Sequence, residues 1–374
     1  MPHHSLGAWF GDQRVRGVLV QLLVIGVVLS LGAWLAHNTI ENLSQRGLAS
    51  GFAFLGRQAN FAIGESMIPY AASDTYGWAM LVGLLNTLKV GVAGLVLATL
   101  LGTLIGLARL SPNWLASRLA GVYVEAVRNV PLLLHLFLWY ALITDGLPGP
   151  RSAFQPLGGV FLCNRGLVMT VPASHPAWTA AAVALVVAVV AAFWLWRRWW
   201  WAPALVPALP LLAWAGLGAP LAMDAPWLLG FNFRGGVTLS PEFLALLLGL
   251  VIYTAAFIAE IVRGGILAVS RGQGEAALAL GLSRGQVMWL VVLPQALRVM
   301  VPPLTSQYLN LLKNSSLAVA IGYPDLVSVL DTTINQTGQA IEGVALIMMV
   351  FLAISLCTSA LMNWYNRRIA LTQG

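Results

Sequence analysis

Few residues of this 374-residue sequence can do chemistry, since 59% are hydrophobic and only 9% are charged. The sequence has no H-E-x-x-H pair, no G-x-S-x-G motif and no G-x-x-x-x-G-K-S/T phosphate loop, which excludes the usual patterns of zinc hydrolases, serine hydrolases and P-loop ATPases. His37, His135 and His175 are scattered, and no carboxylates cluster as metal ligands would. We therefore expect no catalytic residue, no metal and no cofactor bound by this chain.

Two pairs of opposite charge share one spacing, Glu125 with Arg128 and Glu260 with Arg263. Residues three apart lie on the same face of a helix, and a carboxylate near a bilayer end is less costly beside a cation. We interpret both pairs as structural, at the inner ends of two membrane spans. His135 also lies in an apolar run, where a histidine is a functional candidate by default, although we favour a hydrogen bond inside a helix bundle.

A polar stretch beginning at Ser270 separates two apolar regions and reads SRGQGEAALALGLSRGQVMW. Ser270 can cap a short helix, and Glu275 falls in its first turn, where a negative charge suits the helix dipole. Gly281 predicts the end of this helix, because glycine adopts the left-handed conformation readily. Ser283 and Gln286 form a second capping box before an apolar run. The pattern predicts a short exposed helix, a turn, and a helix entering the membrane.

The spacing of this stretch resembles the EAA loop of the permeases of ABC importers. In that family the loop is the coupling helix that docks into a groove of a cytoplasmic ATPase. An EAA triplet alone would be uninformative, but here the triplet is followed by a glycine and a Leu-Pro at the family's spacing. The resemblance implies that the EAA loop, residues 270–294, holds the ATPase-coupling residues Glu275, Ala276, Ala277, Gly281, Leu293 and Pro294.

Three further segments resemble the branch of these permeases that transports polar amino acids, which includes the histidine, glutamine and general L-amino-acid systems. They read YVEAVRNVPLLLHLF, SPEFLALLLGLVIYTAAFIAEIVRGGI and LKNSSLAVAIGYPDL. The resemblance covers roughly residues 83–144 and 240–365, in segments long enough to span a bilayer. An additional N-terminal span and an insertion near residues 145–239 are similar to the general L-amino-acid permease subunits.

The elements that must position these residues are long apolar helices. We predict an all-α, polytopic membrane helix bundle with about eight spans. The resemblance implies that these spans surround a type I ABC-importer permease core. The first run is 19 residues long and is followed by no convincing cleavage site, so we favour a retained span over a signal peptide. The expected spans are 18–36, 83–108, 123–144, 177–196, 202–221, 240–267, a segment after Ser283 broken at Pro294, Pro302 and Pro303, and 342–361.

The second span carries a small residue at every fourth position, at Gly94, Ala98, Gly102 and Gly106. Such a stripe lets another helix approach closely, so we expect it to serve packing.

Basic residues concentrate at one set of span ends, and the net charge is +7. This positive-inside pattern explains the charge better than a nucleic-acid partner and predicts that both termini lie in the cytoplasm. The resemblance implies that the membrane is the bacterial inner membrane. The inner segments hold Arg14, Arg16, Arg109, Arg118, Arg197, Arg198, Arg271, Arg284, Arg367 and Arg368, whereas the outer loops hold Arg46, Arg57, Arg151, Arg165 and Arg234.

The predicted organisation has four parts. Residues 1–82 form an N-terminal tail, a span and an outer loop; residues 83–144 form the first part of the permease core. Residues 145–239 are an inserted outer loop and a two-span hairpin. Residues 240–374 form the second part of the core, with the EAA loop.

The resemblance implies a membrane permease subunit of an ATP-driven importer of L-amino acids, with ATP hydrolysed by a separate subunit. The implied partners are cytoplasmic ATP-binding subunits, a second, similar permease, a periplasmic amino-acid-binding protein and the surrounding lipid. The alternative is an ion-coupled secondary amino-acid transporter, which would also show broken helices. Depletion of ATP with an intact ion gradient separates the two. An integral membrane enzyme is disfavoured by the missing motifs.

A polar segment between two apolar ones, Lys313, Asn314, Ser315 and Ser316, is our candidate for the substrate path. Polar backbone at membrane depth is tolerated only where it is buried in protein or lines a wet cavity. Lys313 and the serine hydroxyls can bind a carboxylate, and Asn314 can bind either a carboxylate or an ammonium group. The alternative is that the segment lies at the outer interface and merely ends a span.

Overall fold

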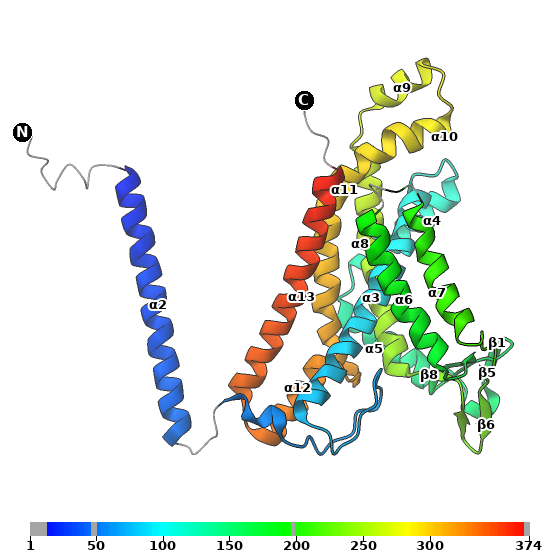
Figure 1. The fold of residues 1–374 in the computed structure, drawn as a ribbon. Coiled ribbons are helices and arrows are strands. Elements are labelled where there is room, and N and C mark those ends of the chain that lie inside the picture. Colours follow the sequence, from blue (N-terminus) through cyan, green and yellow to red (C-terminus); the bar gives the residue numbers. More distant parts are fainter. Residues whose placement is uncertain (1–12, 46–50, 196–198, 200, 370–374) are drawn as a thin grey trace, which may run out of the picture. The chain divides into compact units, whose positions relative to one another are not determined.

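The computed structural model describes residues 13–45, 51–195, 199 and 201–369, and it is mostly helical (Figure 1). The helical class expected from the sequence is confirmed. The chain divides into two compact units, which comprise Met1–Leu84 with Leu326–Ile354, and Leu85–Asp325 with Ser355–Gly374.

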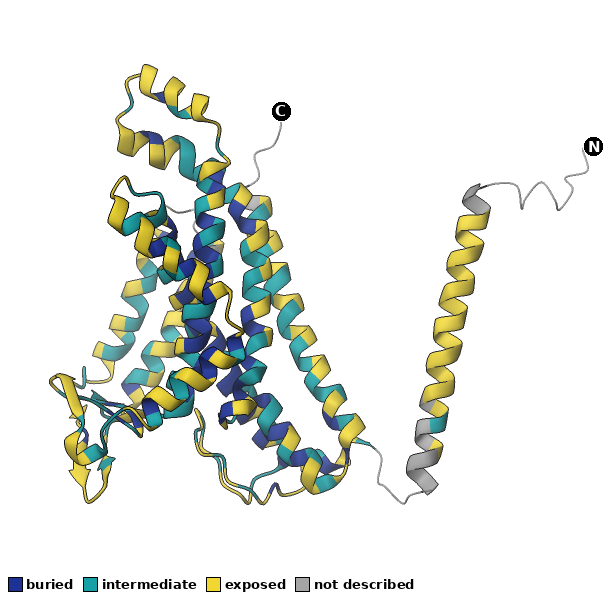
Figure 2. Ribbon diagram, turned by 180° about the vertical axis from the view of Figure 1, so that it is seen from behind, coloured by how far each residue is buried: buried dark blue, intermediate teal, exposed yellow. Residues whose placement is uncertain are grey.

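The first unit begins with α2 (Gln13–Gln45), which contains the first expected span. All residues from Arg16 to Leu35 are exposed (Figure 2), so this helix presents apolar side chains on every side. A helix of that kind needs an apolar surrounding, which lipid supplies.

The remainder of the first unit packs around aromatic side chains. It comprises η1 (Phe52–Gly56), the start of α3 (Tyr76–Arg109), α12 (Leu326–Thr337) and the start of α13 (Ala340–Ile369). Phe54, Tyr76 and Val329 are buried in one cluster. The Tyr76 hydroxyl donates to Gln336 Oε1 at 2.8 Å, and the Glu342 carboxylate accepts from the Gly51 amide at 2.7 Å.

The second unit is built around α8 (Pro241–Leu267), which contacts α4 (Trp114–Arg128), α5 (Leu132–Thr144) and α11 (Leu293–Asn314). The Ser240 side chain accepts from the Phe243 amide at 3.1 Å, so the predicted serine–proline helix start is an N-cap. Leu246, Leu250 and Ile258 of α8 are fully buried.

The small-residue stripe of α3 is a packing surface, as predicted. Gly94 lies against Leu311 of α11, and Gly102 and Gly106 lie against α8. A methyl group at Gly106 would come within 2.7 Å of the Ala259 carbonyl oxygen, so only glycine allows this approach.

The third expected span is not one straight helix, which corrects the prediction for residues 123–144. α4 and α5 meet at a bend of 104° across residues 129–131. Pro131 has no amide hydrogen and disfavours helical backbone at the preceding residue, so the helix cannot continue through it.

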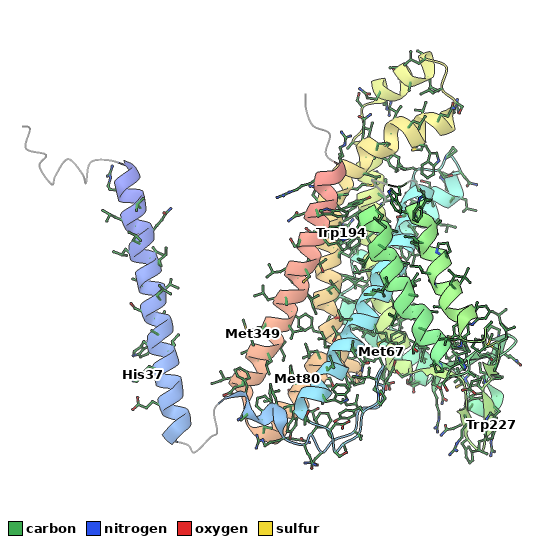
Figure 3. All side chains as sticks on the ribbon, in the orientation of Figure 1. His37, Met67, Met80, Trp194, Trp227 and Met349 are labelled. Atoms are coloured by element: carbon green, nitrogen blue, oxygen red, sulfur yellow. The ribbon has the colours of Figure 1, made fainter. Side chains whose placement is uncertain are left out.

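The insertion contains more than the loop and two helices that we expected. α6 (Pro176–Leu195) and α7 (Leu205–Gly216) pack against each other, as a hairpin should, with η3 (Ala202–Ala204) at the turn. Figure 3 shows Trp227 among the side chains of the strands at one end of this unit. A 3₁₀ turn, η2 (Pro150–Ser152), precedes a set of short strands, all of which pair antiparallel. One sheet has four strands, β1 (Phe154–Leu157), β2 (Val160–Cys163), β3 (Gly166–Met169) and β8 (Val237–Leu239). Two further sheets have two strands each, β4 (Val171–Pro172) with β5 (Met223–Asp224) and β6 (Trp227–Leu229) with β7 (Asn232–Arg234).

The expected spans all coincide with apolar helices, but not all are full-length. Within the described residues five helices are long and apolar enough to cross a membrane, and the bent α4–α5 pair makes six if it counts as one span. The insertion's Pro176–Ala192 and Ala202–Gly216 are shorter. The five are Arg16–Leu35, Tyr76–Arg109, Pro241–Leu267, Arg284–Ile321 and Ala340–Arg367.

Part of the basic pattern used for orientation is not described by the structure. Arg46, Arg197 and Arg198 lie outside the described residues, as do the side chains of Arg14 and Arg368.

Candidate functional site

The EAA helix is present as α9 (Arg271–Ala279), and Gly281 ends it. Gly281 has a φ of +84°, its amide donates to the Leu278 carbonyl at 2.9 Å, and the Leu282 amide donates to the Ala277 carbonyl at 3.2 Å. This pair of bonds is a Schellman motif, which satisfies carbonyls that the helix end leaves free. The predicted stop at glycine is confirmed. The predicted start is wrong, because Ser270 makes no side-chain cap and Glu275, the fifth residue of α9, lies beyond the first turn.

One side of α9 is packed and the other faces outward. Ala277 is buried and lies on the side of α9 that contacts η4 (Val287–Val292), whose first residue, Val287, is also buried. Glu275 and Ala276 are exposed, and Leu280 at the end of the helix has 84% of its surface exposed. An exposed carboxylate on a packed helix and an exposed leucine at its end are both suited to contact a partner protein.

The chain then enters its next long helix through a capping box. The Ser283 hydroxyl accepts from the Gln286 amide at 3.4 Å, and the Gln286 side chain accepts from the Ser283 amide at 2.9 Å. This confirms the predicted cap. α10 (Arg284–Gln286) follows and runs directly into η4.

η4 is a π-helical stretch that immediately precedes Leu293 and Pro294. Proline removes one backbone donor, so the regular ladder is interrupted there. The Gln295 side-chain amide donates to the Val291 carbonyl at 3.0 Å and so supplies a donor at the junction. The Leu-Pro pair of the EAA loop therefore marks the change from π to α helix.

The four substrate-path candidates lie where α11 gives way to the 3₁₀ helix η5 (Ser315–Ile321). Ser315 is buried and its hydroxyl donates to the Leu312 carbonyl at 2.8 Å; the Ser316 hydroxyl donates to the Lys313 carbonyl at 2.7 Å. Lys313 is exposed and Asn314 is partly buried. The polar segment thus marks the point where an α-helix changes to a 3₁₀ helix.

Of the two E-x-x-R pairs, the structure forms one. Arg263 donates to Glu260 Oε1 from Nε at 3.2 Å and from Nη2 at 2.6 Å, and Arg109 of α3 donates to Glu260 Oε2. By contrast, no ion pair among the described residues joins Glu125 to Arg128, which corrects that prediction. The guanidinium carbon of Arg128 instead lies 5.0 Å from the centre of the Phe257 ring of α8.

His135 has a structural setting, as we favoured. It is buried in α5, its Nε2 lies 3.3 Å from the Val127 carbonyl oxygen, and its ring lies 5.8 Å from that of Tyr253. The described residues contain no group of three or more His, Cys, Asp or Glu placed to hold a metal ion.

Residues 94–371 match the family model described as the binding-protein-dependent transport system inner membrane component. The chain belongs to this family. The match includes α9, η4, α11 and the Glu260 ion pairs, so the site described above lies within the part that the family shares.

Full-length relatives of this permease are found in several bacteria. The putative amino-acid ABC transporter permease protein YhdX of Escherichia coli (strain K12) is 50% identical over 97% of this chain and 96% of its own length. The general L-amino acid transport system permease protein AapQ of Rhizobium johnstonii is 48% identical, with 100% and 98% covered. The glutamate/glutamine/aspartate/asparagine transport system permease protein BztB of Rhodobacter capsulatus is 42% identical, with 97% and 95% covered.

Family membership fixes the general role of the permease. It is a multi-pass inner-membrane subunit and not itself an ATPase, and a binding-protein-dependent system implies both an ATPase and a binding protein as partners. What sequence analysis missed is Arg109 as the second partner of Glu260. Its only signal was a basic residue at the end of the second span, and many basic residues share that position.

Proposed function

We propose that this permease is the membrane-spanning subunit of an ATP-driven importer of L-amino acids. The observation that carries the substrate class is its similarity, over nearly the full length, to relatives named for general L-amino acid and for glutamate, glutamine, aspartate and asparagine transport. A polar substrate is consistent with the polar residues 313–316, which lie where α11 changes to the 3₁₀ helix η5, because transporters commonly bind substrates at interrupted helices.

We propose that α9 is the helix that docks on the ATPase. Its packed side would transmit movement to η4 and α11, since Ala277 and Val287 are both buried where α9 meets η4. Glu275 and Leu280, both exposed, would contact the ATPase through charge and apolar surface respectively.

A second, similar permease subunit would complete the pathway, with Lys313, Asn314 and Ser316 facing the pathway and Ser315 buried behind them. Lys313 and Asn314 are the stronger substrate candidates, because both serine hydroxyls already donate to backbone carbonyls. The insertion, residues 145–239, would add an outer domain and a helical hairpin to the core.

We propose that both termini are cytoplasmic. Within the second unit α4, α9 and α10 lie at one end and the strands of the insertion at the other (Figure 1). Arg109, Arg118, Arg271 and Arg284 all belong to that first end, which the positive-inside rule assigns to the cytoplasm.

The test is transport by the complete complex in proteoliposomes. Permease, its partner permease and the ATPase are reconstituted, with the binding protein outside and ATP inside. We expect uptake of labelled glutamate or glutamine that requires both ATP and binding protein and that collapsing an ion gradient leaves intact. Uptake that persists without ATP and stops when the ion gradient is collapsed would indicate a secondary transporter instead.

A further inference from the structure

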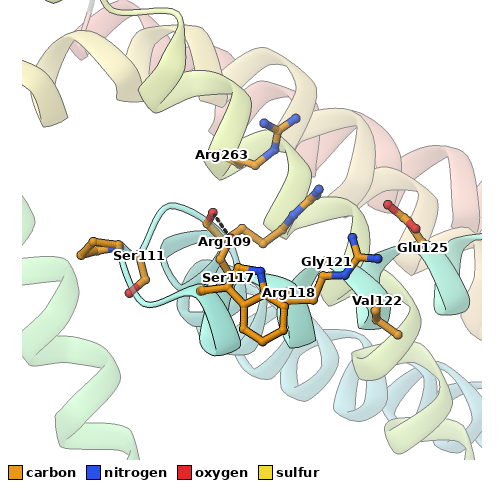
Figure 4. A pocket seen from close by; sticks show the side chains of 10 residues that line it. Arg109, Ser111, Ser117, Arg118, Gly121, Val122, Glu125 and Arg263 are labelled. Carbon is orange, nitrogen blue, oxygen red and sulfur yellow. Dashed lines mark hydrogen bonds between the residues drawn. The ribbon is translucent and has the colours of Figure 1, made fainter.

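A polar cavity of about 480 Å³ lies at the end of the second unit where α3, α4 and α8 come together (Figure 4). Its lining includes Arg109 from α3, Arg263 from α8, and Arg118 and Glu125 from α4. These charged residues belong neither to the candidate substrate path nor to the EAA loop, so the proposed function does not explain why they lie together.

The cavity carries an excess of positive charge. Glu260 neutralises only one of the two guanidinium groups that bind it, those of Arg109 and Arg263. Arg118 and Glu125 lie seven residues apart on one face of α4, and neither belongs to an ion pair within the described part of the chain. Three guanidinium groups against two carboxylates leave one positive charge, which matches a single anionic group such as a phosphodiester.

Arginine side chains, not helix amides, are the donors available to an anion here. The Asn113 side chain accepts from the amides of Leu115 and Ala116 at 3.0 and 3.2 Å, so the start of α4 is already capped. A guanidinium has five N–H donors, and the bonds to Glu260 use only some of those on Arg109 and Arg263. Arg118 is exposed and lines the cavity.

Exposed apolar side chains belong to the cavity and to the helix beside it. Trp114 and Val122, which line the cavity, are 75% and 52% exposed, and Leu119, next to Arg118 on α4, is 61% exposed. Large exposed apolar groups beside arginines at a span end match the boundary between lipid headgroups and acyl chains. A free anion would gain nothing from these apolar side chains, whereas a phospholipid would use both them and the arginines.

We propose that this cavity is a headgroup site for an anionic phospholipid. The phosphodiester lies among Arg109, Arg118 and Arg263, the acyl chains lie along the exposed face of α4, and Glu125 accepts from headgroup hydroxyls. The proposal depends only on the protein being a membrane protein, so it stands or falls separately from the amino-acid substrate.

Lipid binding to the delipidated, purified transporter complex tests this site. Native mass spectrometry measures the apparent affinity for phosphatidylglycerol of wild type and of three variants. We expect Arg118→Gln to weaken binding about fivefold. Glu125→Gln should strengthen binding, because it raises the net charge of the cavity. Arg234→Gln, which removes an exposed arginine in the strands of the insertion, is the control and should leave binding unchanged.

Competitors distinguish the sources of phosphate. Inorganic phosphate at millimolar concentration should displace little phosphatidylglycerol, and phosphatidylcholine, which has no net charge, should bind more weakly. The proposal is overturned if Arg118→Gln binds phosphatidylglycerol like wild type, if phosphate competes fully, or if Arg118→Gln instead releases the ATPase subunit without changing lipid binding. Unchanged thermal unfolding of each variant ensures that a loss reflects the site.

Discussion

Gly281 shows how a single residue sets the geometry of the coupling loop. Its φ of +84° is in the left-handed region, and the two hydrogen bonds of the Schellman motif depend on that conformation. No heavy atom lies within 4 Å of the position where a Cβ would be, so the requirement concerns backbone conformation and not space.

We therefore predict that Gly281→Ala costs about 1 kcal/mol locally, through strain in the left-handed region, and reduces coupling. The variant should remain in the membrane but show weaker stimulation of the ATPase by the binding protein; Gly281→Asp should do the same. Gly285→Ala is the matched control, because Gly285 is helical and equally uncrowded. Normal stimulated ATPase activity and transport in both Gly281 variants would contradict the assigned role.

Glu260 is the second residue whose removal should be costly. It bonds two arginines whose side chains are only 17% and 33% exposed, so its loss leaves two partly buried cations near each other. We predict that Glu260→Gln destabilises the permease by about 1–2 kcal/mol, between the values for exposed and buried pairs.

The measurement is thermal unfolding and membrane abundance of Glu260→Gln beside Glu125→Gln. Glu125 is exposed and belongs to no described ion pair, so its replacement should leave stability nearly unchanged. A Glu260→Gln protein of full stability but altered amino-acid selectivity would mean that Glu260 is a substrate ligand and not a structural partner.

At the scale of elements, α3 and α8 pack closely because glycines of α3 leave room for the backbone of α8. A Cβ on Gly106 would lie 2.7 Å from the backbone oxygen of Ala259 and 2.9 Å from Val262 Cβ, so the helices would have to separate. We predict that Gly106→Ala destabilises the bundle by about 1–3 kcal/mol, as overpacking does elsewhere.

The measurement is the thermal unfolding temperature of Gly106→Ala in detergent, which should be lower than that of the wild-type protein. The control is Gly264→Ala on α8, where a Cβ meets no atom within 4 Å and helix propensity favours alanine. Equal stability of the Gly106 and Gly264 variants would show that the packed stripe contributes nothing.

The sequence was most informative where a local rule acts alone. The stop at Gly281, the capping box of Ser283 and Gln286, and the small-residue stripe follow from backbone conformation and side-chain size, and the structure has all three. The apolar lengths likewise located the helices, because a bilayer requires about twenty apolar residues.

Prediction failed where the outcome depends on residues far apart in the chain. Arg109 reaches Glu260 across 151 positions, and no spacing rule relates them. The E-x-x-R spacing was correct for Glu260 but wrong for Glu125, since Arg128 packs instead over the ring of Phe257, a residue far away in the sequence. The strands of the insertion pair β3 with the distant β8, so short apolar segments gave no sign of a sheet.

At the scale of the whole molecule, alternating access should change the exposure of the polar segment at the end of α11. We predict that a cysteine at position 316, in a background with Cys357→Ser, reacts with a membrane-impermeant thiol reagent, and that a transported amino acid with its binding protein slows the reaction. Cysteine at position 315 should react slowly in every state, because Ser315 is buried.

The rate of thiol labelling at positions 315 and 316 is measured in the complete transporter, with and without ATP. Reaction at position 316 that never responds to substrate or ATP, with unchanged transport, would assign the segment to a passive outer interface. Cys163 is buried and Cys357 is exposed, so replacing Cys357 removes the main background.

The shortness of α9 has a thermodynamic consequence for the assembled transporter. A helix of nine residues is too short to persist in water by itself, so its order derives from contact with η4. Its amide hydrogens should therefore exchange with deuterium quickly in the isolated permease, through local opening, and much more slowly when the ATPase covers its outer side. The rate of exchange across residues 271–279 thus becomes a direct readout of engagement through the ATP cycle, separate from any measurement of transport.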